Sequence, residues 1–187
     1  MKNIAVFASG TGSNFEQIVT RGISGARISL LVTDKICNAL TIAHRHAIPA
    51  VTFERKDFET KTAMEEAIIR VLEERRIDLI VLAGYMRLLS PPFVHRYENR
   101  IINIHPSLLP LYKGKHAIQQ ALEDGRKLYG VTVHYVNEGM DDGQIIEQVR
   151  VVYDGLDIEQ LEGRVHEAEY ELYTRVIQKL IDQEATT

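Results

Sequence analysis

Near its start the chain reads Ile4-Ala5-Val6-Phe7-Ala8-Ser9-Gly10-Thr11-Gly12-Ser13-Asn14, and the architecture can be inferred outward from this stretch. Residues 4–8 are a short apolar run, typical of a strand buried on both faces. Residues 9–14 are small and glycine-rich, and a helical pattern begins at Phe15. A strand, a glycine turn and a helix in this order predict the first unit of an α/β fold with a parallel sheet.

The rest of the first half repeats this alternation. Apolar runs that predict strands lie at 28–32, 51–53, 79–82 and 101–104. Helical patterns cover 39–46 and 58–76, and Ser90 is placed to cap a short helix that has Pro91 at its first position. Buried strands that alternate with helices predict a central, mostly parallel sheet with helices on both faces.

The pattern changes after residue 110. A helix is predicted at 117–123, and two extended runs, 131–136 and 145–153, flank a turn and predict antiparallel strands towards the C-terminal part. Apolar residues three and four apart predict a long C-terminal helix from Ile158 into the 180s, with residues 184–187 frayed. We therefore expect a single Rossmann-like α/β domain over residues 1–187.

Composition excludes several classes of partner. The 187 residues are 45% hydrophobic and 26% charged, with a net charge of -4, so no basic field is available for a nucleic acid. No apolar run approaches the roughly 20 residues that span a bilayer. Cys37 is the only cysteine and cannot form an internal disulfide, and Met1-Lys2-Asn3 enters a strand without a signal peptide. We expect a cytoplasmic protein with no nucleic-acid or membrane partner; a homodimer is compatible with the sequence.

The loop at 9–14 is a candidate phosphate site. A helix N-terminus offers free backbone N–H groups to an anion, glycines allow close approach, and Ser13 adds a hydroxyl. No Lys-Ser or Lys-Thr follows, so the loop is not a Walker motif. Phe15 stands where the dinucleotide fingerprint has its third glycine, which favours a single phosphomonoester over a dinucleotide. A glycine turn without a ligand is the alternative.

Polar groups gather at the predicted strand 101–104. Asn103 interrupts the apolar run, and His105 follows two positions later, so both side chains point to one face. An amide and an imidazole are suited to hold an oxygen that becomes negative during acyl transfer. Asp141, in a turn after a later strand, can fold back to His105 and keep it charged. Two alternatives stay open: purely structural hydrogen bonds, and a metal site formed by His105, His134 and Asp141.

These residues resemble the folate-dependent phosphoribosylglycinamide formyltransferase family over nearly the whole chain. The most specific match is Asn103-Ile104-His105-Pro106-Ser107-Leu108-Leu109-Pro110, together with Gly114 and Gly139-Met140-Asp141-Asp142-Gly143. The segment 83–90 and the loop at 9–14 also match. The resemblance implies transfer of a formyl group from 10-formyltetrahydrofolate to the amine of 5-phosphoribosyl-glycinamide, in de novo purine synthesis, without a metal.

The resemblance also implies roles for individual residues. Asn103, His105 and Asp141 would be the catalytic set, with Asn103 also near the folate. The phosphoribosyl-glycinamide would be held by Gly12, Ser13, Asn14 and Glu169. The folate would be held by Lys61, Met86, Arg87, Leu88 and Leu89, mainly through backbone groups and apolar side chains.

Some positions depart from the family pattern, and other functions remain as alternatives. Tyr112-Lys113, Asp142 and Gln144 replace residues more usual in the loops near the folate. Methionyl-tRNA formyltransferase and formyltetrahydrofolate hydrolase share the Asn-x-His and Asp set, but we expect neither the extra tRNA-binding domain of the first nor the N-terminal regulatory domain of the second. A non-enzymatic nucleotide-binding module would use the phosphate loop and have no need of Asn103, His105 and Asp141.

Overall fold

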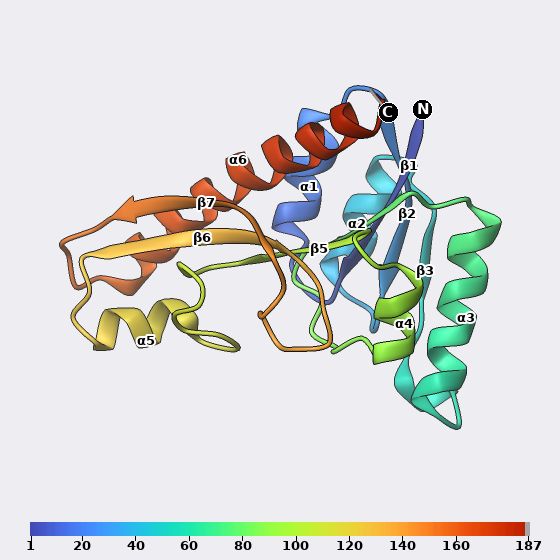
Figure 1. Ribbon diagram of the computed structural model, residues 1–187, viewed down its shortest axis with the longest axis horizontal. Helices are drawn as coiled ribbons and strands as arrows, with labels where there is room; N and C mark the ends of the chain where they lie inside the picture. The colour runs from blue at the N-terminus through green and yellow to red at the C-terminus, as the bar shows by residue number, and fades with distance from the viewer. Residues whose placement is uncertain (186–187) are drawn as a thin grey trace.

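A computed structural model of the protein describes residues 1–185, and its centre is a seven-stranded sheet (Figure 1). The strand order is β3-β2-β1-β4-β5-β6-β7. Pairing is parallel from β3 to β5, whereas β6 runs antiparallel to β5 and β7 antiparallel to β6. The prediction of a mostly parallel sheet with antiparallel strands towards the C-terminal part is confirmed. The strands are β1 (Lys2–Ala8), β2 (Ala26–Thr33), β3 (Ala50–Thr52), β4 (Leu79–Leu82), β5 (Ile101–His105), β6 (Leu128–Tyr135) and β7 (Ile145–Val152).

Helices cover both faces of this sheet, as its sequence pattern predicts. Successive residues of β1 point to opposite faces, so Val6 packs in one apolar core and Phe7 in the other. The first core lies under α1, α2, α5 and α6, and the second lies under α3 and α4. The helices are α1 (Ser13–Arg21), α2 (Asn38–Arg45), α3 (Lys61–Glu74), α4 (Pro91–Arg96), α5 (Ala117–Glu123) and α6 (Ile158–Ala185), with a short 3-10 helix at Arg55–Asp57.

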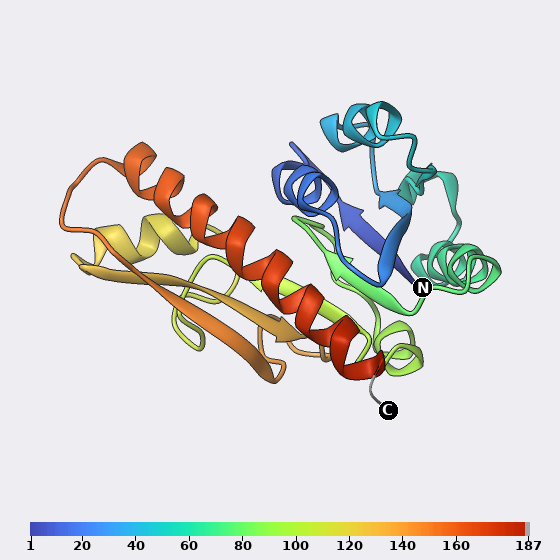
Figure 2. The same ribbon diagram turned by 90° about the horizontal axis from the view of Figure 1, so that it is seen from above.

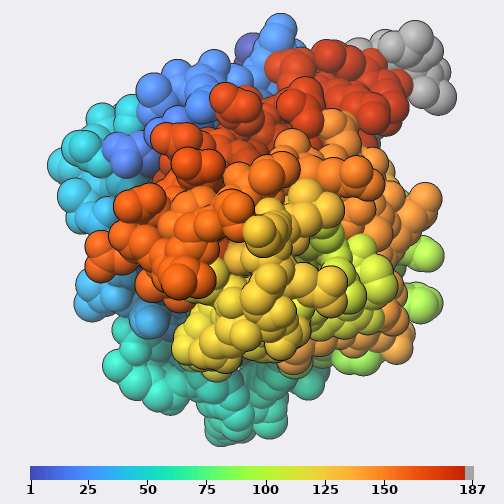
Figure 3. Space-filling view, turned by 90° about the vertical axis from the view of Figure 1, so that its left-hand side faces the viewer, coloured from blue at the N-terminus to red at the C-terminus, as the bar shows by residue number. Residues whose placement is uncertain are grey.

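The C-terminal helix α6 packs against α1 from the start of the chain and against α5, β6 and β7 from its second half. It runs along the sheet face, beside α5 near its start and beside α1 farther along (Figure 2). Tyr173 is fully buried, and its hydroxyl donates to the carbonyls of Leu82 and Ile102, so α6 is tied to β4 and β5 at once. At the far end, α5 and the segment that leads into α6 gather on one face (Figure 3). Each apolar side chain buried along α6 contributes on the order of 1.5–3 kcal/mol.

Two predicted boundaries are wrong by a few residues. Helix α3 begins at Lys61 rather than 58, because the Thr60 hydroxyl accepts from Ala63 N and caps the helix there. Strand β6 begins at Leu128 rather than 131, and it includes Gly130. A side chain at Gly130 would meet Leu108 and the Val149 carbonyl, which explains a glycine inside a paired strand.

No helix within residues 1–185 has the length and apolarity needed to cross a membrane. Residues 186 and 187, part of the stretch expected to fray, lie outside the described residues.

Candidate active site

The polar end of β5 is completed by β6. The antiparallel register sets Asn103 opposite His134 and His105 opposite Thr132. Asn103 Nδ2 lies 3.3 Å from His134 Nε2, and His134 Nδ1 lies 2.8 Å from the Tyr135 carbonyl. His134 Nδ1 is placed to donate to that carbonyl, and its Nε2 lies beside both the Asn103 amide and Asp141 Oδ1, the latter 3.6 Å away. The two-residue spacing therefore builds a polar pair that the neighbouring strand extends.

Asp141 enters this cluster from the loop between β6 and β7. Its Oδ1 accepts from Asn103 Nδ2 at 3.4 Å, and its Oδ2 lies 3.4 Å from His105 Nδ1. The backbone N–H of Gly114 donates to Oδ2 at 2.8 Å, so the carboxylate is fixed from a second loop. The backbone of Asp141 has φ 49, a left-handed conformation that Asp tolerates better than most residues. The structure thus brings Asn103, His105 and Asp141 together, as the sequence predicts.

The surroundings favour an ionised Asp141. Burial by itself raises the pKa of this carboxyl, but the His134 hydrogen bond, the Gly114 N–H and the charges of His105 and His134 outweigh it and lower the pKa. His105 is buried, and its Nε2 lies 2.7 Å from the Tyr112 carbonyl while its Nδ1 faces Asp141. Both ring nitrogens therefore face acceptors, an arrangement that a doubly protonated imidazole satisfies with two N–H donors.

Three members of the cluster were not in the predicted catalytic set. His134, the Tyr112 carbonyl and the Gly114 N–H all contact its polar groups. The signal for His134 was its place in a strand that pairs next to β5, but the β5–β6 register follows a long connection through α5 and cannot be counted from residue spacing. The two backbone groups belong to a loop whose conformation cannot be predicted from the pattern of side chains.

The alternative of a metal site concerns His105, His134 and Asp141, and the structure brings these three residues together. Asp141 stands between the two imidazoles, 3.4 Å from His105 Nδ1 and 3.6 Å from His134 Nε2. These are ion-pair separations, and two ligands that share an ion at about 2.0–2.2 Å lie at a similar distance from each other. Within residues 1–185, no group of three or more His, Cys, Asp or Glu side chains is placed to hold a metal.

The glycine loop forms the second polar region. Gly12 has φ 77 and serves as the N-cap of α1, and a side chain there would meet the Ala39 backbone at 2.9 Å. The Glu16 N–H donates to the Gly12 carbonyl at 2.8 Å, and the N–H groups of Ser13 and Asn14 precede this bond and have no partner inside the helix. Ser13 is the first residue of α1, not its cap. The loop therefore presents backbone donors where the sequence predicts a phosphate.

Glu169 of α6 meets this loop. Asn14 Nδ2 donates to Glu169 Oε2 at 3.2 Å, and the buried Asn14 Oδ1 atom has no hydrogen-bond partner within residues 1–185. Burial raises the pKa of Glu169 to about 7, although the hydrogen bond from Asn14 opposes this shift. The two residues predicted to hold the same substrate are thus in contact, with unused hydrogen-bonding capacity beside them.

The segment after β4 forms the third region. Ser9 accepts from Met86 N through its hydroxyl at 2.9 Å, and Ser9 N donates to the Gly84 carbonyl. Met86 and Leu88 are 67% and 61% exposed, so their apolar side chains are open to a ligand. Leu89 packs at the edge of the second core. Arg87 turns away, and its Nε lies 2.8 Å from Asp34 Oδ2.

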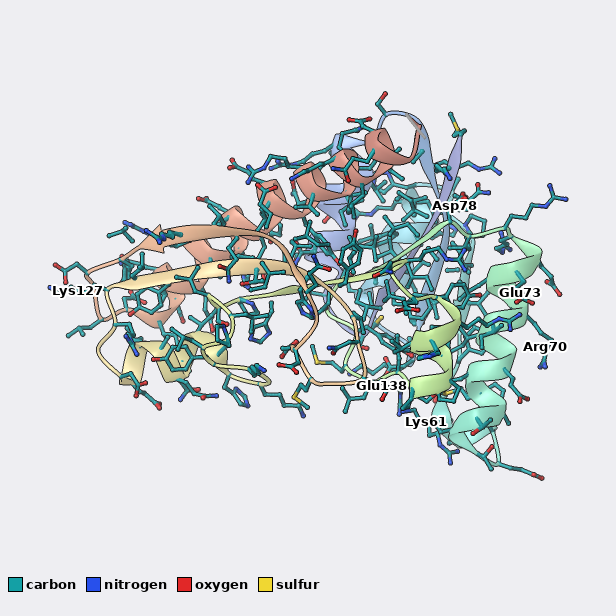
Figure 4. All side chains as sticks on the ribbon, in the orientation of Figure 1. Lys61, Arg70, Glu73, Asp78, Lys127 and Glu138 are labelled. Carbon is teal, nitrogen blue, oxygen red and sulfur yellow. The ribbon has the colours of Figure 1, made fainter. Side chains whose placement is uncertain are left out.

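Lys61 lies at the start of α3, well separated from the catalytic cluster in sequence. Its ammonium is 3.7 Å from Glu65 Oε1, and its side chain is 45% exposed. In Figure 4 Lys61 and Glu138 mark the same lower end of the molecule, and Asp78 marks the opposite end. Glu138, in the loop before Asp141, lies 4.0 Å from His95 of α4. Lys61 is thus at the end of the molecule where the loop carrying Asp141 reaches α4.

Comparisons with known proteins agree with one another. A model of the family described as Formyl transferase matches residues 2–177. The chain is 47% identical to the phosphoribosylglycinamide formyltransferase of Bacillus subtilis over 186 residues, which is 97% of this chain and 95% of that protein. It is 42% identical to the Haemophilus influenzae protein of the same name, covering 95% of this chain and 86% of the relative. The crystal structure of glycinamide ribonucleotide transformylase 1 from Geobacillus kaustophilus is similar with a TM-score of 0.92 and 49% identity, covering 97% of this chain and 99% of that chain.

Proposed function

The chain belongs to the formyl transferase family, and on this premise we propose that it transfers a formyl group from 10-formyltetrahydrofolate to the amine of 5-phosphoribosyl-glycinamide. The products are 5-phosphoribosyl-N-formylglycinamide and tetrahydrofolate, in de novo purine synthesis. The single observation that carries the chemistry is the contact of Asn103 and His105 with one carboxylate, Asp141.

The cluster is suited to stabilise negative charge. The amine nitrogen attacks the formyl carbon, and the carbonyl oxygen becomes an oxyanion. Asn103 provides an amide donor. His105, whose positive charge Asp141 stabilises, provides a fixed positive charge beside the oxyanion. When the tetrahedral intermediate collapses, the bond from carbon to N10 breaks. The proton lost by the amine passes to N10 through this cluster.

The closed hydrogen bonds of His105 bear on this step. In this structure both ring nitrogens face protein acceptors, Tyr112 O and Asp141 Oδ2. A hydrogen bond from His105 to the formyl oxygen therefore requires one of these contacts to be exchanged. The Tyr112 carbonyl belongs to the loop that follows β5, where Tyr112 itself has a left-handed φ of 53. We assign the exchange to this loop, because Asp141 is needed to keep the imidazole charged.

The glycine loop and Glu169 support the choice of acceptor. The N–H groups at the start of α1 suit the phosphate of phosphoribosyl-glycinamide, with Gly12, Ser13 and Asn14 around it. Asn14 Oδ1 and the Glu169 carboxyl are polar atoms buried beside this loop, where they can receive the hydroxyl or amine groups of the same molecule. A tRNA or a water molecule as acceptor would not need this phosphate site.

The segment 83–90 supports the choice of donor. Met86 and Leu88 offer exposed apolar side chains to a pterin, and the backbone of Arg87 and Leu89 lies between and beside them. The cationic Lys61 suits the carboxylate end of a folate. The family implies a folate co-substrate, and these residues are the ones we assign to it.

A direct assay tests the proposal. Purified protein is supplied with 10-formyltetrahydrofolate and phosphoribosyl-glycinamide without added metal, and formation of tetrahydrofolate and of the formylated amide is followed separately. Equal amounts of the two products support transfer. Tetrahydrofolate formed without the acceptor would identify a hydrolase instead. Loss of activity in a chelator, restored by a divalent ion, would favour the metal interpretation of His105, His134 and Asp141.

A further inference from the structure

The segment 83–90 is fixed from beneath by side chains of other elements. Ser9, at the end of β1, bonds Gly84 and Met86. Glu65 of α3 is buried and accepts from both the N–H and the hydroxyl of Ser90. Among the described residues, the polar contact at the middle of the segment is the one between Arg87 and Asp34.

Asp34 is an unusual residue to find buried. It follows β2 and is 6% exposed, yet the Asp34 Oδ1 atom has no hydrogen-bond partner among the described residues. Its Oδ2 lies 2.8 Å from Arg87 Nε, and this approach is an ion pair without the alignment of a hydrogen bond. A buried carboxylate held by one contact is costly for the fold. The described residues offer Asp34 no hydrogen bond that would offset this cost. The ion pair with Arg87 is therefore the contact through which this carboxylate acts.

The residues beside Arg87 show which way the side chains of the segment 83–90 point. The Tyr85 hydroxyl is also buried, with no hydrogen-bond partner in the described part of the chain. Burial and, after it, the negative charge of Asp34 raise the pKa of Tyr85. The Tyr85 ring packs edge-on against Phe7, with the ring centres 5.2 Å apart. Alternate residues of the segment thus point inward, Tyr85 and Arg87, while Met86 and Leu88 point outward. Holding Arg87 in place holds the two exposed side chains on the ligand side.

We propose that Asp34 is a positioning residue for the folate side of the site, acting through its ion pair with Arg87. This inference rests on the proposed function, because it assigns the segment 83–90 to the folate. Asp34 itself does not touch the donor. Ser9 and Glu65 are less informative anchors, since Ser9 adjoins the phosphate loop and Glu65 also binds the capping residue of α4.

The test compares Asp34→Asn, Arg87→Gln and the double variant in the full chain. Asp34→Asn keeps the volume of the side chain and removes its charge. We expect the KM for 10-formyltetrahydrofolate to rise about 10-fold, with the KM for phosphoribosyl-glycinamide and kcat changed by less than about 2-fold. The double variant should be no worse than either single one, because both changes break the same contact.

Asp78→Asn is the matched control. Asp78 pairs with Lys2 at the other end of the sheet, at 3.4 Å, and also accepts from Asn3 N (Figure 4). This variant also loses the charge of an ion-paired carboxylate. It should lower the midpoint temperature of thermal unfolding without changing either KM. Equal rises of both KM values in Asp34→Asn, additive effects in the double variant, or a lower midpoint with an unchanged folate KM would each overturn the proposal.

Two further arms keep the result decisive. If Asp34→Asn does not fold, Arg87→Gln carries the comparison with Asp78→Asn, because Arg87 is partly exposed. If the unmodified protein transfers no formyl group, the proposed function fails on its own. Calorimetric titration with tetrahydrofolate then tests the pair directly: weaker binding in Arg87→Gln but not in Asp78→Asn supports the positioning role, and unchanged binding contradicts it.

Discussion

The cluster of Asn103, His105 and Asp141 and the pair of Asn14 and Glu169 differ in how fully their hydrogen bonds are made. Asp141 accepts from Gly114 N and Asn103, and the ring nitrogens of His105 both face acceptors. Asn14 and Glu169 share one hydrogen bond, and the Asn14 Oδ1 atom has no hydrogen-bond partner in the part of the chain that the structure describes. The first cluster is arranged by the protein itself, whereas the second leaves polar atoms for a ligand to satisfy.

The difference also appears in the two carboxyl groups. Histidines and a backbone N–H lower the pKa of Asp141 against the effect of burial. Burial raises the pKa of Glu169 to about 7, with only Asn14 opposing it. Burial acts in the same direction on both, so the partners decide the charge. A preorganised charge suits the reacting centre, and an unsatisfied acid suits a binding surface.

The largest expected effect comes from substitutions in the cluster of Asn103, His105 and Asp141. We expect His105→Ala and Asp141→Asn each to lower kcat by about 100-fold to 10,000-fold, because each removes part of the charge that stabilises the oxyanion. Steady-state formyl transfer measures the loss. Asp142→Asn is the control, since this neighbouring carboxylate is exposed and pairs with Lys113. Full activity in His105→Ala would show that the cluster is only structural.

The next effect concerns Glu169 and pH. Its pKa is raised from 4.5 to about 7 on folding, so the native state holds an extra proton between these values. The associated stability is fully present below the unfolded pKa and is lost as the pH rises through about 7, a total of about 3 kcal/mol. We expect Glu169→Gln to remove this decline, measured by urea unfolding at about pH 5 and pH 8.

Asp141 gives the opposite sign and serves as the control for Glu169. Its lowered pKa means that its contribution is present above the unfolded value and is lost as the pH falls through the folded value. Asp141→Asn should therefore keep the decline between about pH 5 and pH 8. If Glu169→Gln also keeps it, Glu169 is not the group that titrates.

A smaller effect tests the open side directly. Ser13→Asp places a negative charge at the start of α1, where the phosphate is proposed to bind. We expect the KM for phosphoribosyl-glycinamide to rise about 10-fold, while the KM for the folate stays within about 2-fold. Ser24→Asp adds the same charge in the exposed turn after α1 and should change neither value. Equal damage to both KM values would count against the phosphate assignment.

The smallest effect is expected at Lys61. Its side chain is half exposed and its ammonium is already 3.7 Å from Glu65, so its attraction for a folate carboxylate is screened by solvent. Lys61→Ala should raise the KM for the folate no more than about 5-fold, and the effect should shrink in added salt. Lys56→Ala, a more exposed lysine paired with Glu54, is the comparison. An effect independent of salt would argue for a packing role instead.

Much of the fold could be predicted, because it rests on local patterns. The apolar run at Ile4 and the alternation that follows predict parallel strands between helices, and the spacing along α6 predicts one long helix. Boundaries were less secure where a single residue decides them. Thr60 caps α3 later than the helical pattern suggests. Position 130 of β6 is a glycine because Leu108 and the Val149 carbonyl occupy the space that a side chain would need.

The identity of the polar residues at 103, 105 and 141, their spacing and the glycine loop were readable along the chain, since side-chain chemistry and strand alternation are local properties. The contact of Asn14 with Glu169, the place of His134 opposite Asn103, and the turn of Arg87 towards Asp34 were not. Each joins residues far apart in sequence, so it depends on strand register, loop conformation and the packing of α6, which no local pattern encodes.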